Sequence, residues 1–320
     1  MEATRARVWD RTGLDGRQAL ADSLPFAALL GMFAWCVILQ PQALSIYGVS
    51  LLFSSSIPLV LATISQMFII TLGDIDLGTG YAVGLANVIS ARYLASSPLI
   101  AIGLFAATIL GYMIAGALVE LRRIPSIIVT LGTSFIWLGA ALLILDIPGG
   151  TSPDWLAGIF NWAPSMIPVP FLYAAVIAAV ASVILFRTTL GTVLRGAGSN
   201  PQAVARAGWS LLRIRMLAYG LAGLFGILAG LALTGITTSG DANASANYTL
   251  LAIASVILGG GDFAGGKAAP IGGVVGALAI SLVGSLLALL NVSSDFQSAV
   301  QGIILIVVLA GRSLTRRFEA

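Results

Sequence analysis

Two aspartates, Asp74 and Asp76, are the residues best placed for chemistry, because they interrupt a long apolar stretch of the chain. An isolated charge at the centre of a membrane costs about 2.5–3.5 kcal/mol on an insertion scale, so a buried position would require compensating partners. The alternative is a position at a membrane interface, where Asp76 caps the N-terminus of the next helix. The two residues by themselves leave both positions open.

A second pattern, Gly261-Asp262-Phe263-Ala264-Gly265-Gly266-Lys267, has the spacing of a phosphate-binding loop. The next residue is Ala268, so the hydroxyl that would bind magnesium is missing, and the pattern joins two apolar runs instead of following a strand. We expect a glycine-rich turn with Lys267 as a cytoplasmic anchor. The chain also lacks histidine, the commonest general base and metal ligand. The sequence therefore predicts no catalytic site, no metal site, no cofactor and no ATPase activity.

The longest polar stretch between apolar runs extends from Arg187 to Met216 and contains the signals of one short helix. Asn200, or Ser199 before it, can accept hydrogen bonds from the first free N–H groups. Pro201 suits the first helical position, and Gly208 suits a left-handed exit. Two interpretations are open: an ordinary surface helix, or a helix parallel to the membrane that docks into a soluble partner.

The overall composition defines the elements that must hold these residues. Hydrophobic residues make up 58% of the 320 residues and charged residues 9%, and the mean hydropathy is +1.00. Soluble domains have roughly 25% charged residues, so this chain needs lipid as its solvent. The composition excludes a multi-domain soluble enzyme and predicts an all-α, polytopic transmembrane bundle.

Ten apolar runs are long enough to be considered as membrane spans, since a helix of about 20 residues crosses a hydrocarbon core of about 30 Å. The predicted spans are 24–41, 50–72, 77–95, 98–119, 126–146, 169–186, 216–237, 248–263, 270–290 and 296–311. With the N-terminus in the cytoplasm, all 16 basic residues except Arg92 fall on the cytoplasmic side, as the positive-inside rule requires. We therefore expect both termini to be cytoplasmic.

This topology divides the chain into a cytoplasmic N-terminal tail, a transmembrane domain and a cytoplasmic C-terminal tail. Their predicted bounds are 1–23, 24–311 and 312–320, and the transmembrane domain includes a cytoplasmic loop at 187–215. A weak similarity links residues 72–78 to residues 258–266, each a break rich in glycine and aspartate between two apolar runs. It is compatible with an internal duplication.

From about Ser50 to Gly311 the sequence resembles the ribose-type permeases of ABC importers. Five stretches in the expected order carry the resemblance: Gly73 to Gly78, Thr130 to Thr133, Thr189 to Thr192, Gly198 to Gly208, and Ala252 to Gly260. The resemblance implies a permease subunit in the bacterial inner membrane, forming the pathway for a sugar or similar small polar solute. It further implies an ATP-binding subunit, a periplasmic substrate-binding protein and a second permease chain, identical or paralogous, as partners, with no nucleic acid.

The resemblance also assigns roles to residues. It implies that the short cytoplasmic helix is the coupling helix in contact with the ATPase, formed by Gly198, Ser199, Asn200, Pro201, Ala203, Ala205, Arg206 and Gly208. It places the aspartate break near the translocation pathway, with Asp74, Asp76, Thr130 and Thr133 as candidate pathway residues.

Two alternatives remain beside this expectation. One is a secondary transporter driven by an ion gradient, in which Asp74 and Asp76 would be the ion site. The other is an ABC permease for a nucleoside or a branched-chain amino acid.

Overall fold

The computed structural model describes residues 23–303, except 163, 165, 294, 295, 298 and 301. Within this part the chain is helical and contains no strand beyond an isolated bridge between Gly149 and Gly240. The predicted all-α class is confirmed. Residues 1–22 of the predicted N-terminal tail, the C-terminal tail and most of the last predicted span lie outside the described residues.

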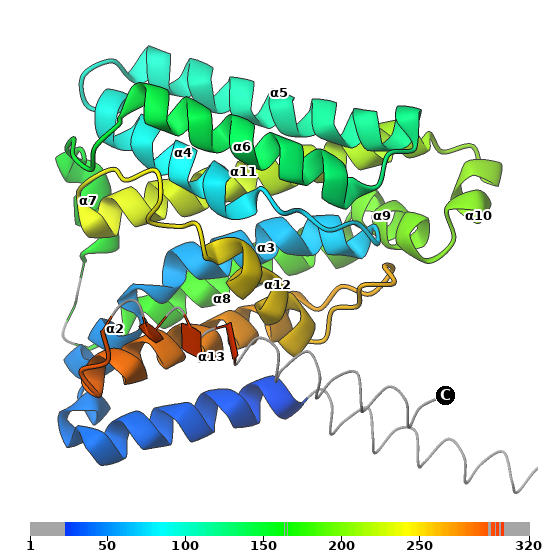
Figure 1. Cartoon of the computed structure of the whole chain (residues 1–320). Helices are drawn as coiled ribbons and strands as arrows, with labels where there is room; N and C mark the ends of the chain where they lie inside the picture. The colour runs from blue at the N-terminus through cyan, green and yellow to red at the C-terminus, as the bar shows by residue number, and fades with distance from the viewer. Residues whose placement is uncertain are drawn as a thin grey trace, which may run out of the picture.

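The helices follow the apolar runs of the sequence (Figure 1). An N-terminal helix covers Ser23–Leu39. The labelled elements that follow are η1 (Pro41–Leu44), α2 (Ile46–Ser54), α3 (Ser56–Thr71), α4 (Thr79–Tyr93), α5 (Pro98–Arg122), α6 (Ser126–Ile144), α7 (Asp154–Phe160), α8 (Val169–Arg187), α9 (Thr189–Ser199), α10 (Pro201–Arg206), α11 (Leu211–Thr237), α12 (Tyr248–Leu258) and α13 (Pro270–Leu289).

Five of the described helices, α5, α6, α8, α11 and α13, are individually long and apolar enough to cross a membrane. The bent pair α2 and α3, with an angle of 48° between its halves, can form a sixth span. Each of the first nine predicted segments carries a helix, but α4 has 15 residues and α12 has 11. At about 1.5 Å per residue, α12 is about 16 Å long and covers half of a hydrocarbon core. The count of ten complete spans stays a prediction.

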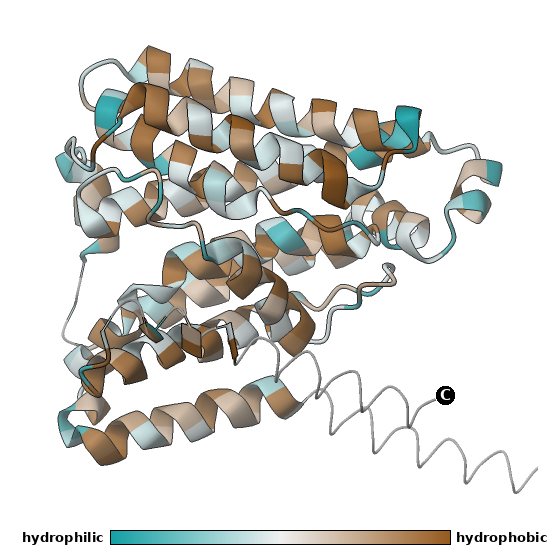
Figure 2. Ribbon diagram, in the orientation of Figure 1, coloured by the Kyte–Doolittle hydropathy of each residue, from teal (hydrophilic) through white to brown (hydrophobic). Residues whose placement is uncertain are grey.

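The core of the bundle is formed by α3 and α11. Every residue of α3 is buried, and α11 packs against α3, α4 and α5. By contrast, α5, α6 and α8 keep many large apolar side chains exposed, such as Leu99, Phe135 and Val183. Figure 2 shows that the ribbons of the peripheral helices are largely brown, the colour of hydrophobic residues. Since lipid solvates apolar side chains, this distribution is the one expected for helices at the periphery of a membrane protein.

The arginines at helix ends give the bundle its polarity. Arg122 ends α5, Arg187 ends α8, and Arg213 lies in the first turn of α11. These three ends lie on the same side as α9 and α10 in Figure 1. We call this side the α10 end of the bundle and the other side the opposite end. The predicted topology makes the α10 end cytoplasmic.

Two segments without regular structure enter the bundle from its two ends. Residues 72–78 lead from α3, at the α10 end, to the N-terminus of α4. Residues 238–247 lead from α11, at the opposite end, to the N-terminus of α12 (Figure 1). Both short helices therefore begin inside the bundle. Irregular backbone at membrane depth is tolerated where protein buries it or where it lines a water-filled cavity.

Candidate functional site

Asp76 holds the irregular segment 72–78 in place. The side chain is 1% exposed, and three donors surround its carboxylate. The Gly78 amide donates to Oδ1 at 2.6 Å, and the hydroxyls of Thr79 and Tyr112 donate to Oδ2 at 2.7 and 2.9 Å. These bonds tie the loop to the start of α4 and to the middle of α5. They provide the compensation that a buried carboxylate requires.

Thr130 binds the backbone of the same segment from α6. Its hydroxyl accepts a hydrogen bond from the Leu77 amide at 3.1 Å and lies 3.1 Å from the Ile75 carbonyl. Thr130 is 1% exposed, whereas Thr133 is partly buried and donates to the Thr130 carbonyl. The structure thus brings Asp76 and Thr130 to one loop, and both bind protein groups there. Contact of these residues with a solute stays a prediction.

Asp74 belongs to a separate charged cluster at the α10 end. Its Oδ2 lies 3.1 Å from Nε of Arg215, and Tyr219 donates to the same oxygen at 3.2 Å. Arg215 also pairs with Glu120 at 2.6 Å, so one guanidinium on α11 joins the loop to the end of α5. Burial raises the pKa of the Asp74 carboxyl in this loop, and Arg215 opposes that rise. The sequence did not reveal these partners, because they are distant along the chain.

The N-termini of α4 and α12 meet inside the bundle. The Gly80 amide donates to Oγ1 of Thr249 at 2.8 Å, and the Ser245 hydroxyl donates to the Gly80 carbonyl at 2.8 Å. A Cβ on Gly80 would lie 2.5 Å from the Ser245 carbonyl oxygen, so glycine is needed for this approach. The contact joins the short helices α4 and α12, whose preceding segments enter the bundle from opposite ends.

Asn87, on α4, binds the first residues of segment 238–247. Its Nδ2 donates to the Thr234 hydroxyl at 2.8 Å and to the Ser239 carbonyl at 3.0 Å, and its Oδ1 accepts from the Asp241 amide at 2.7 Å. Asn87 is 1% exposed. The segment is therefore held along α4 at two places, by the Asn87 side chain near its start and by the Gly80 backbone near its end.

The predicted short helix is confirmed as α10, with the capping expected from its sequence. Oδ1 of Asn200 accepts from the Ala203 amide at 3.0 Å, Pro201 is the first residue, and Gly208 has a φ of +88°. Ala203 and Ala205 are exposed. The helix projects beyond the ends of the neighbouring helices in Figure 1. The helix α9, which precedes α10 and lies along the same end of the bundle, was not predicted from the sequence.

A glycine-packed junction connects α9 to the two breaks at the α10 end, which are segment 72–78 and the α12–α13 connection, residues 259–269. The Gly266 amide donates to the Thr71 carbonyl at 2.8 Å, which joins the α12–α13 connection to the end of α3. Gly198, near the end of α9, lies against the same two groups: a Cβ there would overlap the Thr71 oxygen and lie 2.5 Å from the Gly266 nitrogen. We call Thr71, Gly198 and Gly266 the glycine junction. It places the end of α9, which leads directly into α10, in contact with the segments next to both short helices.

The segment that resembles a phosphate-binding loop lies in the connection from α12 to α13. It follows a helix, and its Gly265 and Gly266 have φ values of +82° and +77°. A phosphate-binding loop follows a strand, so this context does not fit one. The geometry is that of a glycine-rich turn.

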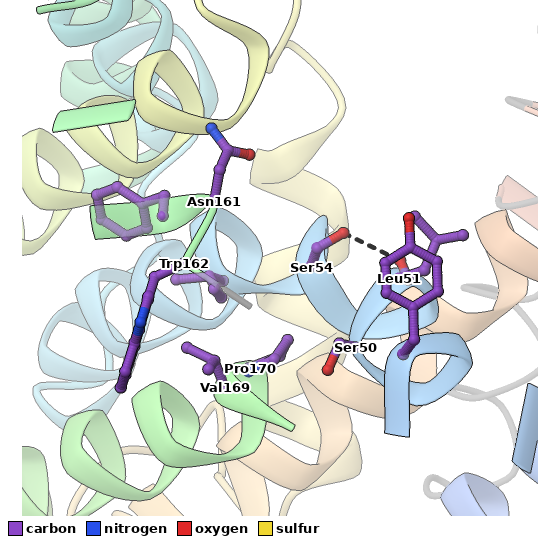
Figure 3. Close-up of a pocket in the computed structure, with 10 residues that line it drawn as sticks. Ser50, Leu51, Ser54, Asn161, Trp162, Val169 and Pro170 are labelled. Atoms are coloured by element: carbon purple, nitrogen blue, oxygen red, sulfur yellow. Dashed lines mark hydrogen bonds between the residues drawn. The ribbon is translucent and has the colours of Figure 1, made fainter. Parts of the chain in front are cut away.

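A small cavity lies at the opposite end of the bundle, away from the glycine junction (Figure 3). Its volume is about 180 Å³, and it is lined by residues of α2, by the residues after α7 and by the start of α8. Two of its polar side chains bind backbone: Asn161 donates to the Gly235 carbonyl at 2.9 Å, and Ser54 donates to its own helix. Trp162 is 56% exposed beside them, as expected for an aromatic residue at a membrane interface. These contacts indicate helix packing.

Long apolar helices around two short helices, with irregular backbone sealed by side chains, define a multi-pass membrane protein with interrupted helices of the kind that transporters use. A family model described as the permease component of the branched-chain amino acid transport system matches residues 48–309. The chain belongs to this family of permease components.

Individual relatives agree with the family. The ribose import permease protein RbsC of Haemophilus influenzae is 30% identical over 306 residues, covering 92% of this chain and 94% of that protein. RbsC of Bacillus subtilis is 30% identical over 295 residues, covering 88% and 90%. The autoinducer 2 import system permease protein LsrC of Photorhabdus luminescens is 28% identical, covering 88% and 86%. The predicted relation to ribose-type ABC permeases is thereby confirmed. No solved structure matches the chain.

Proposed function

We propose that this chain is the membrane-spanning subunit of a bacterial ABC importer for a sugar or similar small polar solute, in the inner membrane. A separate ATP-binding subunit supplies the energy, a periplasmic binding protein delivers the solute, and a second permease chain completes the pathway. The observation that carries the proposal is the projecting helix α10 with the glycine junction at its base. This arrangement suits the transfer of motion from a soluble partner to segment 72–78 and to the α12–α13 connection, which adjoin the two short helices.

Domain boundaries and topology follow from this proposal. Residues 24–311 form the permease domain, the loop 187–215 is cytoplasmic, and the tails 1–23 and 312–320 lie on the same side. Arg206 and Arg213 within this loop agree with the positive-inside rule.

The gradient-driven alternative requires ionisable groups that bind an ion during transport. Asp76 has three protein donors and Asp74 has an arginine partner, so the native contacts of both carboxylates are with the protein. We propose that both act as positioning residues, Asp76 for the start of α4 and Asp74 for the start of α11. Thr130 and Thr133 support the same loop from α6.

The test of the coupling role is Ala205→Trp. Ala205 is exposed on α10 and lies outside the predicted spans, so insertion and yield should be unchanged. An indole cannot fit a cleft shaped for alanine, and overpacking an interface is costly. Solute uptake should therefore be abolished, and less ATPase should co-purify.

Arg206→Ala serves as the control on the same helix. It should reduce uptake much less, because an exposed ion pair contributes about 0–1 kcal/mol. Normal uptake by Ala205→Trp with the ATPase still bound would mean that α10 is an ordinary surface helix.

A further inference from the structure

Segment 238–247 and the first turn of α12 have two distinct sides. Ala242, Ser245 and Thr249 are buried against α4, where glycines 80 and 84 make room for them. Asn243, Ala244, Asn247 and Leu250 are exposed, and Leu250 is 50% exposed. In Figure 1 this segment and α12 lie on the viewer's side of the bundle, and in Figure 2 the segment is pale to teal beside brown helices. We call the exposed residues 243, 244, 247 and 250 the amide face.

The depth of the amide face follows from the length of α12. That helix runs from Tyr248 to Leu258, and its end packs against the start of α13: a Cβ on Gly272 would lie 2.8 Å from the Gly259 carbonyl carbon. Because α13 starts at the α10 end, the amide face lies about 16 Å from that end, near the middle of a core of about 30 Å. Two asparagine side chains and non-helical backbone are thus exposed at mid-membrane.

Lipid is an unsuitable neighbour for such a surface. Non-helical backbone at membrane depth is found where protein buries it or where it lines a water-filled cavity. The buried side satisfies the first condition, through Asn87, Ser245 and Thr249. The amide face is exposed on this chain, so it meets either a second permease chain or water, and its polar amides favour water. From the exposed amides, and resting on the proposed function, we infer that the amide face lines the aqueous solute pathway and that Asn243 and Asn247 contact the hydroxyl groups of a neutral, polyhydroxylated solute.

The charge of the amide face argues for that class of solute. Its four residues are uncharged, and the nearby Asp241 carboxylate accepts from the backbone N–H of Asn243 at 2.8 Å. An asparagine side chain offers both donors and acceptors, as a sugar hydroxyl does. A zwitterionic amino acid would favour charged partners for its two ionised groups.

The test measures the water accessibility of engineered cysteines in the membrane-embedded complex. In a Cys36→Ala background, which removes the natural cysteine, Asn243→Cys and Asn247→Cys are treated with a charged, membrane-impermeant thiol reagent. The control is Leu110→Cys, in the middle of α5 and 56% exposed on an apolar helix. Both asparagine positions should react at least about tenfold faster than the control, since thiolate chemistry needs water. Equal rates at positions 110 and 247 would overturn the assignment.

A second measurement addresses the solute. A mixture of pentoses and hexoses should slow the labelling of Ala244→Cys, which lies on the amide face and keeps both asparagines, and leucine should not. Slowing by leucine, or by neither, would overturn the assignment to a hydroxyl-bearing solute. Labelling needs no ATP, so a chain that fails as an ATP-driven importer but labels rapidly would contradict the proposed function and leave the aqueous pathway intact.

Discussion

Replacing Asp76 by leucine should remove most of the folded protein from the membrane. The substitution leaves the Gly78 amide and the Tyr112 hydroxyl without their buried acceptor, and it leaves the Thr79 hydroxyl only the Gln66 side-chain amide. Each stranded donor costs about 1–3 kcal/mol, so the loss is a large part of a typical folding free energy of about 5–15 kcal/mol. The measurements are the yield of monodisperse protein after detergent extraction and its thermal midpoint.

Tyr112→Phe is the matched control for this prediction, because it removes one of the three hydrogen bonds and keeps the ring that stacks on Trp137. It should lower the thermal midpoint by a smaller amount and retain uptake. Normal yield and stability of Asp76→Leu without uptake would contradict this prediction. The Asp76 carboxylate would then contact the solute or an ion, as expected for a residue of the translocation pathway.

Replacing Gly198 by alanine should uncouple the transporter while leaving it assembled. The added methyl group would overlap the Thr71 carbonyl and press on the Gly266 amide, so α9 must move away from both breaks. Both contacts are backbone atoms, which cannot adapt by changing rotamer. We expect uptake to fall by at least about tenfold, a loss of about 1.4 kcal/mol or more in coupling, while the ATPase still co-purifies because α10 is unchanged.

Gly139→Ala is the control for this second prediction. Gly139 lies on α6, and a Cβ there would meet nothing within 4 Å, so uptake should be normal. Normal uptake by Gly198→Ala would show that the glycine junction carries no motion. Loss of the bound ATPase from Gly198→Ala would show that the junction supports assembly instead.

The sequence predicted the features that depend on local chemistry. Apolar runs predicted where helices lie, since each residue's preference for lipid is a local property. The cap of α10 was predictable because Asn200, Pro201 and Gly208 act on neighbouring backbone groups.

The partners of the aspartates could not be predicted in this way. Tyr112 is 36 residues from Asp76, and Tyr219 is 145 residues from Asp74. Such contacts depend on helix packing, which hydropathy does not encode. For this reason the break at residues 72–78 was placed correctly between two apolar runs, while its burial stayed open between two alternatives.

The short length of α12 could not be predicted from the sequence either. The predicted span 248–263 combined the 11 residues of α12 with the glycine-rich turn, because glycine and alanine keep a hydropathy window apolar. The similarity between residues 72–78 and 258–266, and the internal duplication it suggests, stay a prediction. In the fold, segments 72–78 and 238–247 share a different feature, because each follows a long helix and leads to a shorter one.

The central claim is that ATP hydrolysis on a partner drives solute through this chain. The most direct test is uptake into proteoliposomes that contain the complex of this chain with its co-purified ATPase, with the binding protein outside. ATP inside the vesicles should produce accumulation of the solute, and a protonophore should leave it unchanged. Accumulation without ATP that collapses with the protonophore would contradict the account and identify a gradient-driven transporter.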